Sequence, residues 1–396
     1  MRRRLAGLIG LVALAIAAPA PAAAVEVAPG VEWTTIVRER GPVRINVLDV
    51  DPSRVRGVLS NETVARRERV TAMGRRIGAV AGVNGGYFAA SGDPVGVLAA
   101  NGQLLSEPVD GRSALILSAG RASVAPVRFR GQVSVNGRTR EIDGVDRVRG
   151  LIPACGGRGG DLPTTRPNAA LTCTDASELV LLSPRYGARP PREGGVEAVL
   201  RDGTVATVRA PGSGRVPREG LLLTGTGDAA RFLRDVALPR SRAEVSLRLT
   251  AAGRPLAIAP PAGGAAPGAQ RVVVGGGPRL LRAGRVAVTA KAEGFAPPQA
   301  HAFYGAFVAA RQPRTLAGVR PDGRLLLVTV DGRRPGWSVG MTLSEAARLM
   351  RSLGARDALN LDGGGSTAMT VRGELVSMPS DRVGERPVSD GLFVLP

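Results

Sequence analysis

One acidic residue followed by three glycines is the strongest chemical signal in the sequence. The stretch 358–367 reads Ala-Leu-Asn-Leu-Asp-Gly-Gly-Gly-Ser-Thr, so an apolar run ends at Asp362. Glycine adopts positive φ and lets the backbone approach a ligand closely, which would place Asp362 beside exposed N–H groups at the end of a strand. Such a carboxylate can move a proton or stabilise a cationic carbon. The same letters also fit a simple tight turn.

Other polar residues stand among glycines or arginines elsewhere in the chain. They are Asn84-Gly85, Arg314-Thr315, Asp331-Gly332 and Gly384-Glu385-Arg386. The arginine guanidinium is a rigid fork that suits phosphate oxygens, and glycine-rich turns offer N–H groups to the same oxygens. Two carboxylates, Asp362 and Glu385, with anion-holding groups nearby would suit the cleavage of a sugar from a phosphate.

The C-terminal part predicts the elements that would position these residues. Residues 324–330 form an apolar strand that ends at Asp331, and Thr342 and Glu345 have the spacing of a capping box at the start of a helix. The next strand, 358–361, ends at Asp362. A strand, a helix and a second strand predict a right-handed parallel crossover. Both acids would then lie at the carboxyl edge of one sheet, where open α/β sheets bind ligands.

The remaining chain differs in character. Residues 63–76 are expected to form an Arg-rich helix, and 79–83 a short apolar strand before Asn84. From about 110 to 260, short β-like runs alternate with Gly, Pro and Asp turns, which is typical of a mostly β segment. We therefore expect a catalytic domain made of residues 25–111 and 257–396, with residues 112–256 as a β-rich insertion.

The N-terminus predicts export. Three arginines, an apolar run from Leu5 to Ala18 and small residues before Val25 are typical of a signal peptide over residues 1–24, cleaved near Ala24-Val25. We expect no transmembrane segment after cleavage, because no later apolar stretch reaches about 20 residues. In an exported protein, Cys155 and Cys173 suggest a disulfide, although two free thiols in a core would also fit.

The charge balance gives weaker information. The formal net charge is +20, and Arg supplies all but one of the 53 basic residues. A positive field favours an anionic substrate or an anionic polymer of the cell envelope. Aromatic residues are only 3% of the chain, so a stacking platform for nucleic acid is not expected.

Six motifs in order carry a resemblance to a known family. They are Asn84-Gly85-Gly86-Tyr87-Phe88, Arg311-Gln312-Pro313-Arg314-Thr315, Val330-Asp331-Gly332-Arg333, Ser338-Val339-Gly340-Met341-Thr342-Leu343, Leu359 to Thr367, and Pro379-Ser380-Asp381 through Gly384-Glu385-Arg386-Pro387-Val388. Together they resemble the phosphodiester glycosidase family over about residues 75–110 and 271–396. The resemblance implies an α+β domain, a mixed sheet flanked by helices, that hydrolyses a sugar-1-phosphodiester.

The roles that we assign on this basis are hypotheses. Asp362 is the first candidate for the acid, base or cation-stabilising carboxylate, and Glu385 is the second. The predicted substrate- and phosphate-binding residues are Asn84, Gly85, Arg314, Thr315, Gly363, Gly364, Gly365, Ser366 and Arg386. Asp331 would either join the site or support the glycine-rich loop by accepting backbone hydrogen bonds.

Three questions stay open at this level. Asp and carbonyl oxygens in glycine loops suit Ca²⁺ or Mg²⁺, but no ligand string of known spacing appears, so no metal residues are nominated. A non-catalytic envelope module that binds glycan or phosphoglycan would use the same pocket for recognition alone. A phosphodiesterase that cuts the P–O bond instead of the C–O bond is a third reading.

Overall fold

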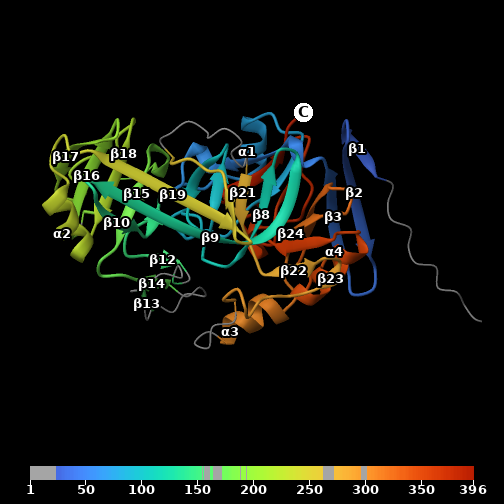
Figure 1. The fold of residues 1–396 in the computed structure, drawn as a ribbon. Helices are drawn as coiled ribbons and strands as arrows, with labels where there is room; N and C mark the ends of the chain where they lie inside the picture. The colour runs from blue at the N-terminus through green and yellow to red at the C-terminus, as the bar shows by residue number, and fades with distance from the viewer. Residues whose placement is uncertain are drawn as a thin grey trace, which may run out of the picture.

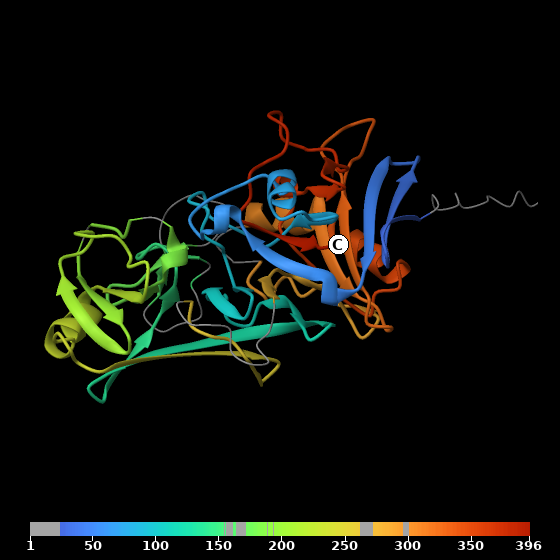
Figure 2. The same ribbon diagram turned by 90° about the horizontal axis from the view of Figure 1, so that it is seen from above.

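The computed structural model describes residues 24–153, 155, 161–163, 172–187, 189–192, 194–261, 272–295 and 301–396. Most of the predicted signal peptide, residues 1–23, lies outside these residues, as does most of the Pro- and Gly-rich stretch that ends at residue 270. The described chain forms two lobes of unequal size, and two long strands run from one to the other (Figures 1 and 2).

The larger lobe contains two sheets that meet at the candidate site. The first has eight strands in the order β1 (Val25–Ala28), β2 (Val31–Arg38), β3 (Val43–Val50), β25 (Leu325–Val330), β24 (Arg314–Val319), β26 (Asp357–Asn360), β22 (Arg279–Arg282) and β23 (Arg285–Val286). The second has five, in the order β28 (Glu374–Leu375), β27 (Met369–Val371), β5 (Ala81–Asn84), β29 (Asp390–Val394) and β4 (Val55–Leu59).

A third sheet extends from the larger lobe toward the smaller one. Its order is β20 (Arg254–Leu256), β19 (Ala243–Ala251), β9 (Arg121–Val135), β8 (Ser113–Ser118), β21 (Val272–Gly275), β6 (Leu98–Ala100) and β7 (Gln103–Ser106), with β10 (Arg138–Ile142) paired to β9. The 15-residue strand β9 and its partner β19 are the two strands that link the lobes in Figure 2.

The smaller lobe contains a five-stranded sheet. Its order is β11 (Gly144–Val145), β15 (Leu179–Leu182), β18 (Leu221–Gly225), β16 (Val196–Arg201) and β17 (Thr204–Arg209), and α2 (Gly227–Val236) packs against it. A three-stranded sheet of β12 (Ile152–Pro153), β14 (Thr172–Thr174) and β13 (Leu162–Pro163) lies nearby. The Cys155–Cys173 disulfide closes this region, with its Cα atoms 4.9 Å apart, so the predicted pairing is confirmed.

The expected fold class is wrong. Over the described residues, strands account for 44% and helices for 14%, and the sheets are mainly antiparallel and curled, so the protein is mostly β. The α-helices there are α1 (Val70–Arg76), α2, α3 (His301–Tyr304) and α4 (Leu343–Ser352). The helix expected over 63–76 is confirmed only from Val70 onward.

The error has a physical cause in the apolar strand β25. Every residue of β25 is buried, a pattern that is typical of parallel sheets covered by helices on both faces. Here Leu325 and Leu327 point into a core shared with the other sheets, while Leu326 and Val328 pack toward α4. One sheet face is therefore covered by other sheets and the opposite face by a helix.

The local prediction around α4 is confirmed. The Thr342 hydroxyl accepts a hydrogen bond from the Glu345 N–H (3.1 Å), and the Glu345 carboxylate accepts one from the Thr342 N–H (2.9 Å), which completes the capping box. Strand β24 pairs antiparallel with both β25 and β26, so β25 and β26 run parallel on either side of it. Their carboxyl ends, with Asp331 and Asp362, therefore lie at one edge of the sheet.

Candidate functional site

A pocket of about 230 Å³ opens at this sheet edge, beside Asp362. Its lining has two chemically different walls. The polar wall consists of Gln312, Arg314, Arg333 and Asp362 with Gly363 and Gly364, and the apolar wall consists of Phe303, Ala306 and Phe307. Strand β24 begins with Arg314 at the edge where β26 ends, which explains how residues almost 50 positions apart share one wall.

Asp362 is held by its backbone on both sides. Its N–H donates to the Gly85 carbonyl (3.1 Å), and its own carbonyl accepts from the Asn84 side-chain amide (2.8 Å). The carboxylate accepts a hydrogen bond from the Gly363 N–H (2.9 Å). Burial raises the pKa of Asp362 to about 6, although the Ser366 hydroxyl, the Gly363 N–H and the Arg386 charge lower it. Asp362 is therefore mainly ionised at neutral pH and can accept a proton.

Asn84 and Thr315 form the buried support beneath Asp362. The Asn84 side-chain oxygen accepts hydrogen bonds from the Thr315 hydroxyl (2.6 Å) and from the Ala368 N–H (3.1 Å). Together with its bond to Asp362, these contacts occupy both ends of the Asn84 amide. Both side chains are buried, so their contacts fix the position of the loop.

Arg314 is a buried cation at the pocket wall. Only 1% of the residue is exposed, and its guanidinium donates to the carbonyls of Met341 (2.8 Å), Phe307 (2.7 Å) and Ala310 (3.2 Å). Among the described residues no carboxylate forms an ion pair with it. Burial lowers the pKa of Arg314 to about 10, and the nearby Arg333 charge adds to this shift. A buried charge without a counter-ion is costly, and an anion in the pocket would compensate it.

The glycines are required by close packing. A Cβ atom on Gly363 would lie 2.8 Å from the Pro313 carbonyl oxygen, and Gly364 has a φ of +60°. A Cβ on Gly365 would collide with the Arg386 guanidinium, and one on Gly85 would collide with the carboxylate of Asp390. The sequence signal of Asp-Gly-Gly-Gly therefore reflects a crowded loop.

The structure separates the remaining predicted residues from the pocket lining. Both carboxylate oxygens of Glu385 accept hydrogen bonds from Thr71, one from its N–H (2.9 Å) and one from its hydroxyl (2.6 Å), at the first turn of α1. Arg386 makes two hydrogen bonds to Asp381 (2.7 and 3.0 Å) and influences Asp362 through its charge. Glu385 thus stabilises a helix, and Arg386 belongs to an ion pair near the glycine loop.

Asp331 has a defined local environment. Its carboxylate accepts hydrogen bonds from the Trp337 indole N–H (3.0 Å) and from the Met378 N–H (3.0 Å). Only 2% of Asp331 is exposed, and burial raises the pKa of its carboxyl group. These contacts hold the 331–338 loop against the 376–379 segment. Asp331 lies at the same sheet edge as Asp362 but does not line the pocket.

Sequence reasoning missed Asp390. This residue begins β29, and its carboxylate accepts a hydrogen bond from the Gly86 N–H (3.0 Å). Burial raises the pKa of Asp390 to about 6, and its charge raises the pKa of Asp362. The charge of Asp390 therefore influences Asp362, although less than burial does. The signal was the pair Asp390-Gly391 at a strand, an acid–glycine pattern like that at Asp362.

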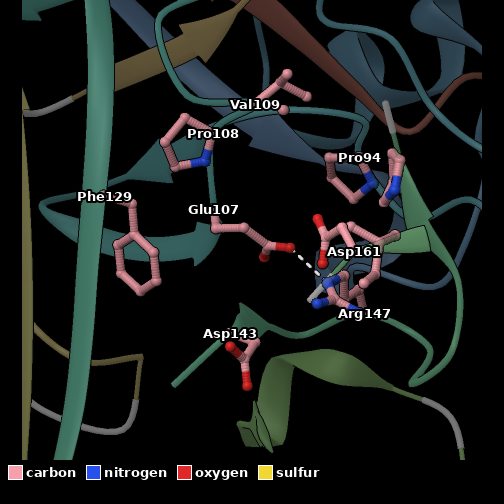
Figure 3. Close-up of a pocket in the computed structure, with 11 residues that line it drawn as sticks. Pro94, Glu107, Pro108, Val109, Phe129, Asp143, Arg147 and Asp161 are labelled. Carbon is pink, nitrogen blue, oxygen red and sulfur yellow. Dashed lines mark hydrogen bonds and ion pairs between the residues drawn. The ribbon is translucent and has the colours of Figure 1, made fainter. Parts of the chain in front are cut away.

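A second group of buried charges lies elsewhere and is structural. The close-up in Figure 3 shows Glu107 directed toward Arg147, with Asp143 and Asp161 nearby. Arg147 forms ion pairs with Glu107 (2.6 Å) and Glu178. The cavity between them is only about 10 Å³, close to the volume that one water molecule needs. The cluster joins the end of β7, in the larger lobe, to the segment that follows β11. The cavity at this cluster is too small for a substrate.

Within the described ranges, no group of three or more His, Cys, Asp or Glu side chains is arranged to hold a metal ion. No helix there has the length and apolar character needed to span a bilayer.

Comparisons with known proteins agree with the motifs. The family model described as phosphodiester glycosidase matches residues 194–395. The mouse N-acetylglucosamine-1-phosphodiester alpha-N-acetylglucosaminidase is 37% identical over 78 residues, which are 20% of this chain and 15% of that protein. The SPbeta prophage-derived uncharacterized protein YomE of Bacillus subtilis (strain 168) is 40% identical over 84 residues, 21% of this chain and 13% of that protein. The matches thus span about a seventh of these curated relatives.

A solved structure is similar over most of the chain. The crystal structure of the "Putative exported protein" from Burkholderia pseudomallei K96243 has a TM-score of 0.78 and 34% sequence identity. The match covers 90% of this chain and 74% of that one. Because the match extends across both lobes, the two proteins share the two-lobed fold.

Proposed function

Because this chain belongs to the phosphodiester glycosidase family, we propose that it hydrolyses the glycosidic bond of a sugar-1-phosphodiester and releases the sugar. One observation supports this function above the others. Arg314, a buried arginine with no ion-pair partner among the described residues, lines the same small pocket as Asp362, a carboxylate whose pKa is raised by burial to about 6. Arg314 is suited to bind a phosphate anion, and Asp362 is suited to act as a proton acceptor.

The proposed reaction needs few protein groups. A water molecule attacks the anomeric carbon, and its proton passes to the Asp362 carboxylate. The bond between that carbon and the bridging oxygen breaks, and its electron pair leaves on the phosphate monoester. Arg314 and Arg333 stabilise the charge that develops there. A phosphate monoester is a weakly basic leaving group, so this scheme requires no separate acid.

The direct test measures release of sugar. We would incubate the protein with the methyl phosphodiesters of the α-1-phosphates of N-acetylglucosamine, glucose, galactose and mannose and detect free reducing sugar. Hydrolysis of at least one diester is expected, and an Asp362→Asn variant should lose most of it. If the folded protein binds these diesters without turnover, it is a recognition module and the proposed function is wrong.

Isotope labelling identifies the bond that breaks. In water enriched in ¹⁸O, the label is expected in the sugar. Label in the phosphate product would instead indicate attack at phosphorus. The same assay with EDTA, and then with added Ca²⁺ or Mg²⁺, tests the metal dependence that the sequence leaves open.

Export is part of the proposal. The signal-like residues 1–24 and the Cys155–Cys173 disulfide both suit an oxidising compartment outside the cytoplasm. There, the chain without Arg2, Arg3 and Arg4 would still carry a formal net charge of +17 and would meet anionic polymers of the cell envelope, which we propose as the source of its substrate. N-terminal sequencing of the exported protein should begin at or near Val25, and an intact N-terminus would contradict the predicted cleavage. Absence of the protein from the extracytoplasmic fraction would contradict the export prediction.

A further inference from the structure

The apolar wall of the pocket is built from aromatic side chains in a chain that has very few. The sequence contains seven Phe, three Tyr and two Trp, and four of these rings pack together beside Asp362. They are Tyr87, Phe295, Phe303 and Phe307. Phe303 belongs to α3, and Phe307 belongs to the π-helical turn Gly305–Ala309 that follows it.

Three of these rings form an ordered stack. Phe295 and Phe307 are stacked with centroids 5.3 Å apart, and Phe307 and Phe303 are stacked at 5.2 Å with planes only 7° apart. The guanidinium of Arg112 covers Phe295 at the inner end, 4.3 Å from the ring centroid. Phe303 is the outer end, and on its outer side no ring or cation from the described chain stacks against it.

The outer end of the stack coincides with the pocket. Phe303, Ala306 and Phe307 line the same cavity as Asp362 and Arg314, and the Arg314 guanidinium lies 5.5 Å from the centroid of the Phe307 ring. The rings of Phe303 and Phe307 are only half-buried. Ring faces carry a negative quadrupole and attract the weakly positive C–H groups of a ligand. A pyranose has such a C–H face, while its edge carries polar hydroxyl groups. One apolar wall and one polar wall match these two sides of a sugar ring.

We infer that Phe303, supported by Phe307, forms the subsite for the sugar ring of the substrate. The ring would stack with its C–H face on Phe303 while its anomeric carbon points toward Asp362 and the phosphate toward Arg314 and Arg333. The substrate class is then a pyranosyl phosphodiester, with specificity for the sugar residing in helix α3 and the turn after it. This inference rests on the proposed function and assigns the part of the pocket that the polar residues do not explain.

Variants of Phe303 test the inference. Phe303→Ala and Phe303→Leu remove the ring face and should raise KM for the most rapidly hydrolysed diester about 3- to 10-fold, the range expected for loss of one ring stack. Phe303→Tyr keeps the ring and should retain the parent KM. Tyr304→Ala is the matched control, because Tyr304 is the neighbouring aromatic on α3 but is exposed and does not line the pocket.

A second ligand separates sugar binding from damage to the pocket. Dimethyl phosphate carries the phosphodiester without a sugar, so its inhibition constant should be the same for Phe303→Ala and the parent. An unchanged KM in Phe303→Ala would overturn the inference, and so would an equal rise in the KM and in the dimethyl phosphate inhibition constant. If no diester is hydrolysed by the parent, the proposed function fails first. If one is hydrolysed and the Phe303 variants behave like the parent, only this inference fails.

Discussion

The side-chain amide of Asn84 donates a 2.8 Å hydrogen bond to the main-chain oxygen of Asp362. Asn84 ends β5 of the five-stranded sheet, and Asp362 follows β26 of the eight-stranded sheet. The bond therefore joins two sheets at the point where the pocket opens. Because this bond is made to the backbone, it fixes the position of Asp362 and does not occupy the carboxylate oxygens, which can still accept a proton.

Replacement of Asp362 should separate catalysis from folding. Asp362→Asn preserves the size of the side chain and the backbone hydrogen bonds, but the amide cannot take a proton. We expect kcat to fall by about 10²- to 10⁴-fold, as for other acid–base groups, with little change in the melting temperature. Steady-state kinetics and thermal unfolding measure both. Near-parent turnover in a folded Asp362→Asn protein would remove Asp362 from the mechanism.

The rate should depend on pH through the same carboxylate. If Asp362 acts as a base, kcat/KM should fall about tenfold per pH unit below the pKa of about 6 and level off above it. The Asp390 charge raises this pKa, so Asp390→Asn should move the acid limb to lower pH. A limb that stays in place in this variant would show that the two carboxylates do not interact.

Arg333 offers a test of phosphate binding that does not threaten the core. It lines the pocket, but it is exposed, and within the described part of the chain its side chain donates a hydrogen bond only to Gln312 (2.6 Å). Arg333→Ala should raise KM by at most about 10- to 100-fold, which corresponds to the roughly 1.5–3 kcal/mol of one charge-assisted hydrogen bond. It should also weaken inhibition by inorganic phosphate. Arg351→Ala, on the exposed side of α4, is the matched loss of charge and should change neither.

The disulfide should affect stability but leave the activity intact. Cys155 and Cys173 are 18 residues apart. Cys173 lies in β14 and Cys155 follows β12, and neither lines the pocket. Replacing both with Ser should lower the free energy of unfolding by about 3 kcal/mol, the loop-entropy value for a loop of this size. Urea titrations with and without a reductant measure the change. A large loss of kcat in the folded double variant would argue against a purely local role.

Buried carboxyl groups should make the protein less stable as the pH rises from 4 to 7. Burial raises the pKa of Asp143, Asp362 and Asp390 to about 6 and that of Asp146 to about 7. The reference pKa of each is 3.8, so between these values the folded state binds more protons than the unfolded state. Stability from these groups is present below pH 4 and is lost as the pH rises through 6 to 7.

Thermal unfolding at several pH values checks this expectation. The melting temperature should be lower at pH 7.5 than at pH 5. Asp146→Asn should flatten the decline, since Asp146 has the highest of the four values and its carboxylate is bonded only to the N–H and hydroxyl of Ser183 (2.6 Å each). A variant as steep as the parent would mean that other groups control the dependence.

Short sequence patterns predicted local structure well. The capping box at Thr342, the acid–glycine loop after β26 and the cysteine pair each depend on residues close in the chain or on one strong covalent preference. Asn84, Arg314 and Asp362 also converge on one region, because glycine-flanked polar residues at strand ends mark close backbone approach. The family resemblance added the order of these motifs.

Long-range pairing is what the sequence reveals least. Glu385 was predicted as the second carboxylate from its motif, and that role stays a prediction, but the motif does not reveal that its oxygens are bonded to Thr71, which lies over 300 residues earlier. Asp390 was overlooked because its acid–glycine pair alone does not reveal that its carboxylate accepts a hydrogen bond from Gly86 and lies close to Gly85. The fold class failed for a similar reason, since a fully buried strand such as β25 does not specify whether a sheet or a helix covers it.

The spread of the pocket along the chain has a consequence for biosynthesis. Asn84 and Gly85 leave the ribosome early, Arg314 and Asp362 much later, and Asp390 later still. Until residue 390 has been translated, β5 lacks its partner β29, and the loop that carries Asp362 rests on an unfinished scaffold. The nascent polypeptide therefore lacks a finished pocket for nearly the whole of its elongation, and the loop that carries Asp362 can reach its final position only after the last strand has been made.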